Sequence, residues 1–342
     1  MTQCLETLGA PAPTVHLQVV VGVARCELEA CVDSVVMPTW PALPYEDWKP
    51  TKQTLHRYAQ MVGKVRMALV QPRNHWWHVT LYVSTRGLTT GPMPVGDGRT
   101  AEVELDFLGH ELRVRSSDGR SAGFALRDRL ACAHFYRDLF QALSEVGVDV
   151  EIHPEPFDLG DSPAFPDDTE HDSYDANAVE RWWAILRATD GVLAGFASRF
   201  NGKTSPTQVF WHGLDLAHAR YSGRRAPAIE GADAITKEAY SHEVIAFGWW
   251  PGDDRRNPYP AFYAYTAPEP GGLAEQPLRP AAAEWQDTGN GSLAVLPYDA
   301  MRSAPDPRAA LLDFYESAYL AGAGTAGWDL EAFRTPQAGH AF

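Results

Sequence analysis

Residues 98–120 read GRTAEVELDFLGHELRVRSSDGR, and this stretch indicates most clearly which secondary structure the chain builds. Alternation of apolar and polar residues with a period of two is typical of a β-strand with one buried face. The parity of the apolar positions changes at Gly109, so the pattern predicts a strand with a bulge at this glycine and a turn at Asp118–Gly119. The apolar positions are Val103, Leu105 and Phe107 before the change, and Leu112 and Val114 after it.

The rest of the chain places strand-like runs in blocks, with helix-like segments between the blocks. Helical spacing predicts helices over 51–63 with Thr51 as N-cap, over 126–146, and in two segments that begin after the capping residues Asp175 and Asp306. Blocks without strict alternation favour an α+β fold of mostly antiparallel sheet and long amphipathic helices. The strand-like runs lie at 78–84, 148–152, 207–211, 240–250, 261–266 and 292–298.

Composition changes along the chain predict its domain organisation. The N-terminal segment holds three of the four cysteines and differs in composition from the rest, so we interpret it as a poorly ordered extension or as sequence upstream of a true start at Met37. The predicted segments are the extension 1–37, a first α+β subdomain 38–153, an acidic loop 154–175, a second α+β subdomain 176–330 and a tail 331–342.

Overall composition excludes several classes of protein. A net charge of −15 argues against nucleic-acid and anionic-membrane partners, because a phosphate surface requires a basic face. No apolar run has membrane-spanning length, and the run at 14–24 has no Lys or Arg ahead of it, unlike a secretory signal. No Cys-x-x-Cys pair occurs, so we expect no zinc, and the cysteine usage fits a reducing cytoplasm. The sequence indicates no oligomeric state.

The stretch NHWWH at 74–78 raises the question of a metal or catalytic site. If this region is a strand, His75 and Trp77 point to one face, and Trp76 and His78 point to the other. The two histidines then cannot bind one ion together. The face of Trp76 and His78 resembles a pocket wall, so His78 is a catalytic candidate and Trp76 a ligand-binding one; the alternative is a structural histidine.

A basic segment stands out in this acidic chain. Residues 201–225 contain Lys203, Arg220, Arg224 and Arg225 against the single acid Asp215, with glycines between them. Such a segment is typical of an anion-binding region, because guanidinium groups bind carboxylate or phosphate at two points. The alternative is that these arginines pair with the acidic loop 154–175. That loop could also hold a cation through HDSYD (171–175), although its usual fate is a solvated loop.

The motifs WPALPYEDWKPT (40–51), NHWWHVTLYVSTRGLTT (74–90), GKTSP (202–206), DLAHARYSGR (215–224) and PAFYAYTAPEP (260–270) occur in order, together with HDSYD. With them the chain, from about Trp40 to Trp328, resembles the DUF5996 family of bacterial proteins, whose activity is not established. After GKTSP the family usually carries VHFFWG. Here the segment reads TQVFWHG, so Gln208 stands in place of a family histidine and His212 is added.

Two functions from different classes fit these observations. One is an enzyme acting on a small anionic molecule, with His78, His242 or Glu243 transferring protons and with Lys203, Arg220 and Arg224 holding the anion. Asp215, the acid of the same segment, is a further ligand-binding candidate. The other is a non-catalytic protein that binds a small ligand or a carbohydrate on exposed tryptophans. The chain has no nucleophile elbow, dinucleotide fingerprint or HExxH signature, so the sequence indicates no cofactor. The stacking candidates are Trp76, Trp249 and Trp250.

Overall fold

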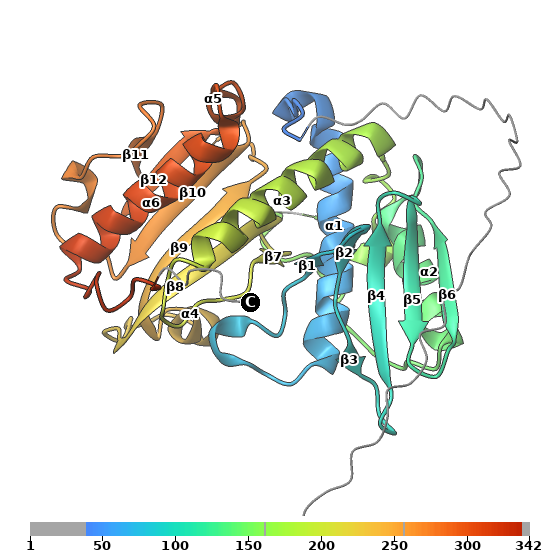
Figure 1. Cartoon of the computed structure of the whole chain (residues 1–342). Coiled ribbons are helices and arrows are strands. Elements are labelled where there is room, and N and C mark those ends of the chain that lie inside the picture. Colours follow the sequence, from blue (N-terminus) through green and yellow to red (C-terminus); the bar gives the residue numbers. More distant parts are fainter. Residues whose placement is uncertain (1–38, 161, 256, 337–342) are drawn as a thin grey trace, which may run out of the picture. The chain divides into compact units, whose positions relative to one another are not determined.

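The computed structural model describes residues 39–160, 162–255 and 257–336. All of these residues belong to one compact unit. The expectations for the N-terminal extension lie outside the described residues. Within them, six α-helices accompany two antiparallel sheets of six strands each, which confirms the α+β class (Figure 1).

The first sheet contains the opening stretch of sequence, but as a hairpin. β4 (Thr100–Asp106) and β5 (Glu111–Ser116) pair antiparallel, with Val103 opposite Val114 and Leu105 opposite Leu112. The predicted bulge at Gly109 is wrong, because the chain reverses direction there and both sets of apolar residues reach the same face. The strand order is β1 (Tyr82–Val83), β2 (Gly87–Thr89), β4, β5 and β6 (Ser121–Ala125), with β3 (Met93–Pro94) also on β4.

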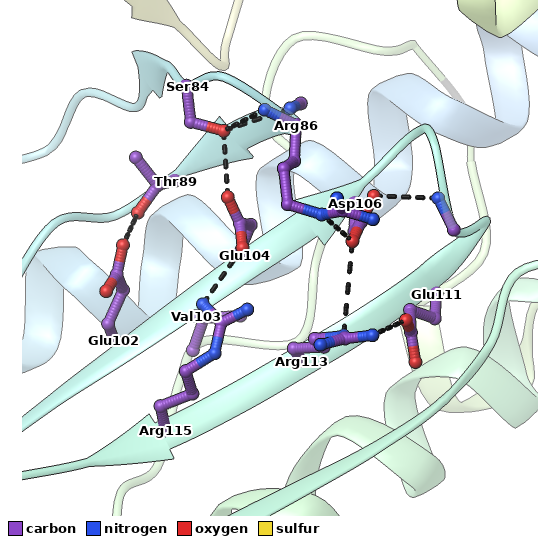
Figure 2. A network of polar contacts seen from close by, with 12 residues as sticks. Ser84, Arg86, Thr89, Glu102, Val103, Glu104, Asp106, Glu111, Arg113 and Arg115 are labelled. Carbon is purple, nitrogen blue, oxygen red and sulfur yellow. Dashed lines mark hydrogen bonds and ion pairs between the residues drawn. The ribbon is translucent and has the colours of Figure 1, made fainter. Parts of the chain in front are cut away.

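The two faces of this sheet differ in chemistry. The apolar side chains of β4 and β5 are buried, and α2 (Cys132–Glu145) packs against β5 and β6. The other face carries acids on β4 opposite arginines on β5, joined in a network of ion pairs and hydrogen bonds (Figure 2). Arg115 lies 2.9 Å from Glu104, and Arg86 lies 2.5 Å from the buried Asp106. Asp106 Oδ1 also accepts the N–H groups of Leu108 and Gly109, which stabilises the hairpin turn.

The second sheet forms the floor of the candidate site. Its order is β11-β12-β10-β9-β8-β7, all antiparallel. Helices α3 and α6 cover one face of this sheet (Figure 1). A backbone bridge between Leu81 and Val209, with N–H···O distances of 2.9 and 2.8 Å, joins the two sheets. The strands are β7 (Gln208–Phe210), β8 (Asp215–Arg225), β9 (His242–Trp250), β10 (Ala261–Ala267), β11 (Glu284–Asp287) and β12 (Ser292–Pro297).

The helices follow the predicted capping signals in two cases out of three. Asp175 Oδ1 accepts two N–H groups at the start of α3, and Asp306 Oδ1 accepts the Ala309 N–H at the start of α6. Thr51 is not an N-cap, because α1 begins six residues earlier at Tyr45; its hydroxyl instead accepts the N–H of Asp175. The α-helices are α1 (Tyr45–Leu69), α2 (Cys132–Glu145), α3 (Ala176–Ala197), α4 (Ala234–Ala239), α5 (Tyr298–Arg302) and α6 (Pro307–Thr325).

Two predicted strands differ from the structure. Residues 148–152 are irregular. The strand predicted over 78–84 is present only as β1 (Tyr82–Val83), with an isolated bridge at Leu81, and residues 74–76 before it form the short 3-10 helix η1 (Asn74–Trp76). His75 and Trp76 have φ values of 55° and 61°, in the left-handed region that a strand never occupies. The assignment of alternating faces to NHWWH is therefore wrong.

Candidate functional site

A cavity of about 870 Å³ lies against the face of the second sheet that α3 and α6 leave free. Its floor comes from β7–β10, and η1, α4, α1 and Phe157 supply its walls. Nine of its lining residues are Phe, Trp or Tyr, so the cavity is predominantly apolar and aromatic. A cavity of this size and lining is typical of sites that enclose a small molecule.

The strand sequences explain why this face is hollow. Several of the residues on β8 and β9 that face the cavity are small, namely Ala217, Ala219 and Ala246. Tyr265 lies beside Ala246 in the register, and Tyr263 lies beside Gly248. A side chain at position 248 would come within 2.5 Å of the Tyr263 hydroxyl, so glycine is required there. Small residues on the central strands thus leave room above them, and tyrosines on β10 form one side.

Asp215 is the acidic group at the floor of the cavity. Its Oδ2 accepts the hydroxyl hydrogen of Tyr263 at 2.5 Å. Burial raises the pKa of the carboxyl group, against the effect of nearby His212 and of the Tyr263 hydrogen bond, which lower it. Among the described residues, no lysine or arginine lies within ion-pair distance of this carboxylate. Asp215 is therefore a carboxyl group in surroundings that are mostly apolar and aromatic.

Tyrosine hydroxyls continue from Asp215 toward α4. The rings of Tyr263 and Tyr265 are stacked with centroids 6.3 Å apart, and the hydroxyl of Tyr265 lies 3.2 Å from that of Tyr240. Burial raises the pKa of both β10 tyrosines well above its usual value, so their hydroxyls stay protonated. They can donate hydrogen bonds to a carboxylate or to a ligand.

His75 fixes the wall formed by η1. The ammonium of Lys203 donates to His75 Nε2 at 2.8 Å, so the ring proton is assigned to Nδ1, which faces the Ala239 carbonyl at 3.3 Å. The backbone N–H of His75 also donates to Glu238 Oε1 at 3.2 Å. Burial, and then the charge of Lys203, lowers the pKa of the imidazole. A left-handed residue costs about 1–3 kcal/mol, and these contacts with α4 and Lys203 offset that cost.

The other histidine of NHWWH lies away from the cavity. His78 is only 4% exposed, and its Nδ1 accepts the backbone N–H of Arg73 at 3.2 Å. Its ring packs against Trp76, whose own side chain does line the cavity. The η1 geometry therefore places His75, and not His78, at the cavity wall.

The structure does not bring the predicted basic groups together in one cavity. Arg220 lies on the opposite face of β8 from Asp215, because side chains alternate along a strand. Its guanidinium donates to the Phe196 carbonyl and stacks 3.4 Å above the Phe196 ring, and burial lowers its pKa to about 10. The expectation that Arg220 and Arg224 reach one cavity is therefore wrong.

Arg224 and Glu243 form a pair of their own. Arg224 lies 2.7 Å from Glu243, which also accepts hydrogen bonds from Ser222 and from Trp328 Nε1. The acidic loop 154–175 pairs with other arginines, for example Arg57 at 3.1 Å from Asp168. His242 lies near the site without lining it, with its ring centroid 5.6 Å from that of His75.

The HDSYD segment is committed to local contacts. His171 Nδ1 lies 2.9 Å from Asp168, Asp172 pairs with Arg129, and Asp175 caps α3. Over the ranges that the structure describes, no three His, Cys, Asp or Glu side chains are placed to hold a metal ion. In the same ranges, no helix is both long and apolar enough to cross a membrane.

Comparison with known proteins gives a family but no activity. The model of a family of unknown function, DUF5996, matches residues 40–335, which is most of the chain. The chain belongs to the DUF5996 family. No curated protein and no solved structure matches it.

In this DUF5996 chain, the position where the resemblance implied a histidine lies at the cavity. Gln208 is 1% exposed, lines the cavity and accepts the Thr80 hydroxyl hydrogen at 3.0 Å. His212 also lines the cavity and contributes to the environment of Asp215. Gln208 therefore gives the cavity wall a hydrogen-bonding side chain.

Sequence reasoning missed the tyrosines of the site. Of the residues predicted to bind ligand, Asp215 and Trp76 line the cavity, whereas Tyr263 and Tyr265 were not singled out. Their signal was present, because AFYAYT (261–266) places both tyrosines on one face of a strand and Phe262 on the other.

Proposed function

We propose that this chain binds a small molecule with a largely apolar, ring-bearing body in the aromatic cavity. The observation that carries the proposal is the cavity of about 870 Å³ with its aromatic lining and the single floor carboxylate of Asp215. Aromatic side chains offer large contact areas to flat ligands, and a few polar groups fix their orientation. Asp215 and its Tyr263 partner are the groups that would orient the ligand.

An enzyme that uses the same cavity is the second candidate. A carboxyl group with a raised pKa, hydrogen-bonded to a tyrosine and open to a cavity, is suited to proton transfer. Asp215 would be the acid or base, in place of His78, His242 and Glu243. An anionic substrate has less support, because Arg220 and Arg224 do not line the cavity and Lys64 donates to two backbone carbonyls.

Native mass spectrometry of the purified protein, compared with a cavity-filling variant, tests the binding proposal. Ala219→Phe places a ring in the cavity, and Ala194→Phe places the same ring on an exposed position of α3. We expect a co-purifying small molecule, or an added aromatic probe, to bind the parent and Ala194→Phe but not Ala219→Phe. Equal binding by both variants, with folding verified by circular dichroism, would contradict the proposal.

A further inference from the structure

The acidic and basic groups around the cavity differ in whether they are paired, and this difference bears on the charge of a ligand. Among the described residues, no lysine or arginine pairs with Asp215, its Oδ2 accepts a hydrogen bond from the neutral Tyr263 hydroxyl, and the nearby His212 imidazole is the group whose charge lowers its pKa. Lys64 reaches the wall, but its ammonium is held by the carbonyls of His153 at 3.0 Å and Glu155 at 2.6 Å. Within the described ranges, the carboxylate therefore has no lysine or arginine counter-ion, and a neutral His212 leaves it without a paired positive charge.

The other ionisable groups of the wall do not fill this role. Asp233 also lines the cavity, but its carboxylate caps α4 by accepting the N–H groups of Ile235 and Thr236. His75 is neutral, with Nε2 occupied by Lys203. The ionisable groups that share the cavity with Asp215 are His212, His218 and Tyr221 on or beside β8, Tyr263 and Tyr265 on β10, Lys64 on α1, Asp233 and Tyr240 at the two ends of α4, and His75 on η1.

The aromatic lining favours positive charge in the same space. Ring faces carry negative potential and attract ammonium groups at up to about 6 Å from the centroid. The protein already uses two cavity residues in this way, because the Lys203 ammonium lies 5.3 Å from the Trp77 centroid and 4.9 Å from the Tyr221 centroid. Lys203 itself is not among the residues that line the cavity.

We propose that the cavity selects a monocationic ligand, a protonated amine on an apolar or aromatic body, with its ammonium group at Asp215. This inference rests on the proposed small-molecule binding and names the class of ligand. The ammonium would donate to Asp215, while Tyr263 keeps its hydrogen bond to Oδ2 and the ring faces of β10 and η1 surround the body.

Binding of an amine should release a proton. In the empty cavity, burial holds the pKa of Asp215 above its ordinary value. An ammonium group beside the carboxylate lowers that pKa, so the carboxyl group loses its residual proton as the amine enters. The heat of binding should therefore depend on the ionisation enthalpy of the buffer, and this dependence should grow as the pH is lowered.

Titration calorimetry with three probes of similar shape tests the proposal. The probes are 2-phenylethylamine as the cation, 2-phenylethanol as the neutral molecule and 3-phenylpropionate as the anion. We expect the amine to bind about tenfold more tightly than the alcohol, the gain of one charge-assisted hydrogen bond in a partly desolvated site. The anion should bind most weakly.

Two matched variants identify the carboxylate responsible. Asp215→Asn keeps an acceptor for Tyr263 but removes the charge, so the amine should lose its tenfold advantage over the alcohol. Asp233→Asn keeps a good N-cap for α4 and should retain the preference for the amine.

The outcomes distinguish the inference of an amine ligand from the broader proposal that the cavity binds a small molecule. Binding of the alcohol or the anion as tightly as the amine, blocked by Ala219→Phe, would overturn the amine assignment and leave small-molecule binding in place. Amine preference that survives Asp215→Asn would also overturn the assignment. Absence of binding by all three probes, together with no co-purifying molecule that Ala219→Phe excludes, would overturn both.

Discussion

Replacing Gly63 with alanine is expected to destabilise the protein, although alanine is the better helix former. Gly63 is buried within α1, at the point where this helix contacts Trp211. An added Cβ atom would overlap the indole and lie 2.5 Å from its Cγ, whereas carbon atoms pack favourably at about 3.5–4.0 Å. One of the two groups must therefore move.

Trp211 has little freedom to move. Its Nε1 donates to the Val79 carbonyl at 2.8 Å, and its own carbonyl lies 2.9 Å from His56 Nε2. Overpacking costs about 1–3 kcal/mol or more, and the helix preference for alanine returns about 1 kcal/mol. Because Trp211 is held at both ends, we expect the upper part of this range and a net loss of about 2 kcal/mol.

Thermal denaturation measures this loss against a matched control. At about 2–4 °C per kcal/mol, Gly63→Ala should lower the Tm by about 4–8 °C. Gly191→Ala, in α3, is the control, because a Cβ there meets nothing closer than Arg308 Nη1 at 4.0 Å. It should gain up to about 1 kcal/mol from helix preference. If Gly63→Ala were as stable as Gly191→Ala, the close contact between α1 and Trp211 would be refuted.

Three further predictions concern the titration of Asp215, the contact between η1 and α4, and the roles of the two arginines. The pKa of Asp215 is raised in the folded protein, so the protein loses stability as the pH rises from 3.8, the ordinary pKa of the group, through the folded pKa. Asp215→Asn does not ionise, so its Tm should exceed that of the parent at pH 8 and equal it at acidic pH, when Tm is measured against pH. His75→Ala removes the side-chain contacts to Lys203 and Ala239, so amide hydrogen exchange over 234–239 should accelerate while exchange in α3 stays unchanged. Arg220→Ala should cost about 3 kcal/mol in denaturant unfolding through lost ring stacking, whereas Arg224→Ala, at the partly exposed pair with Glu243, should cost about 1 kcal/mol or less; equal losses would contradict their placement.

The fold was predictable from sequence where local chemistry decides it. Asp175 and Asp306 mark helix starts because a short acidic side chain satisfies N–H groups within its own first turn. The NHWWH segment was not predictable, because the left-handed backbone of His75 depends on Glu238, Ala239 and Lys203, which are distant in sequence. Its content of Val, Thr and Tyr pointed to a strand, and tertiary contacts overrode that preference.

The candidate site was harder to predict, because β8 lacks a clear polarity pattern. Its buried face carries His218 and Arg220, and its cavity face carries alanines with Asp215 at one end. Because both faces of this strand mix polar and apolar residues, the usual alternation is lost, and residues 201–225 appeared only as a basic segment. Charge counting identified Asp215 but placed Arg220 with it, since a sum over sequence does not distinguish the two faces of a strand.

The bridge between Leu81 and Val209 links the binding of a ligand in the cavity to the stability of the connection between the two sheets. Two backbone hydrogen bonds there join the sheets, and the cavity takes its walls from both sides of that connection. A molecule bound between η1 and β10 would add contacts across the same connection. It would therefore stabilise the backbone bridge against local opening, and amide hydrogen exchange at Leu81 and Val209 would slow as the cavity is saturated.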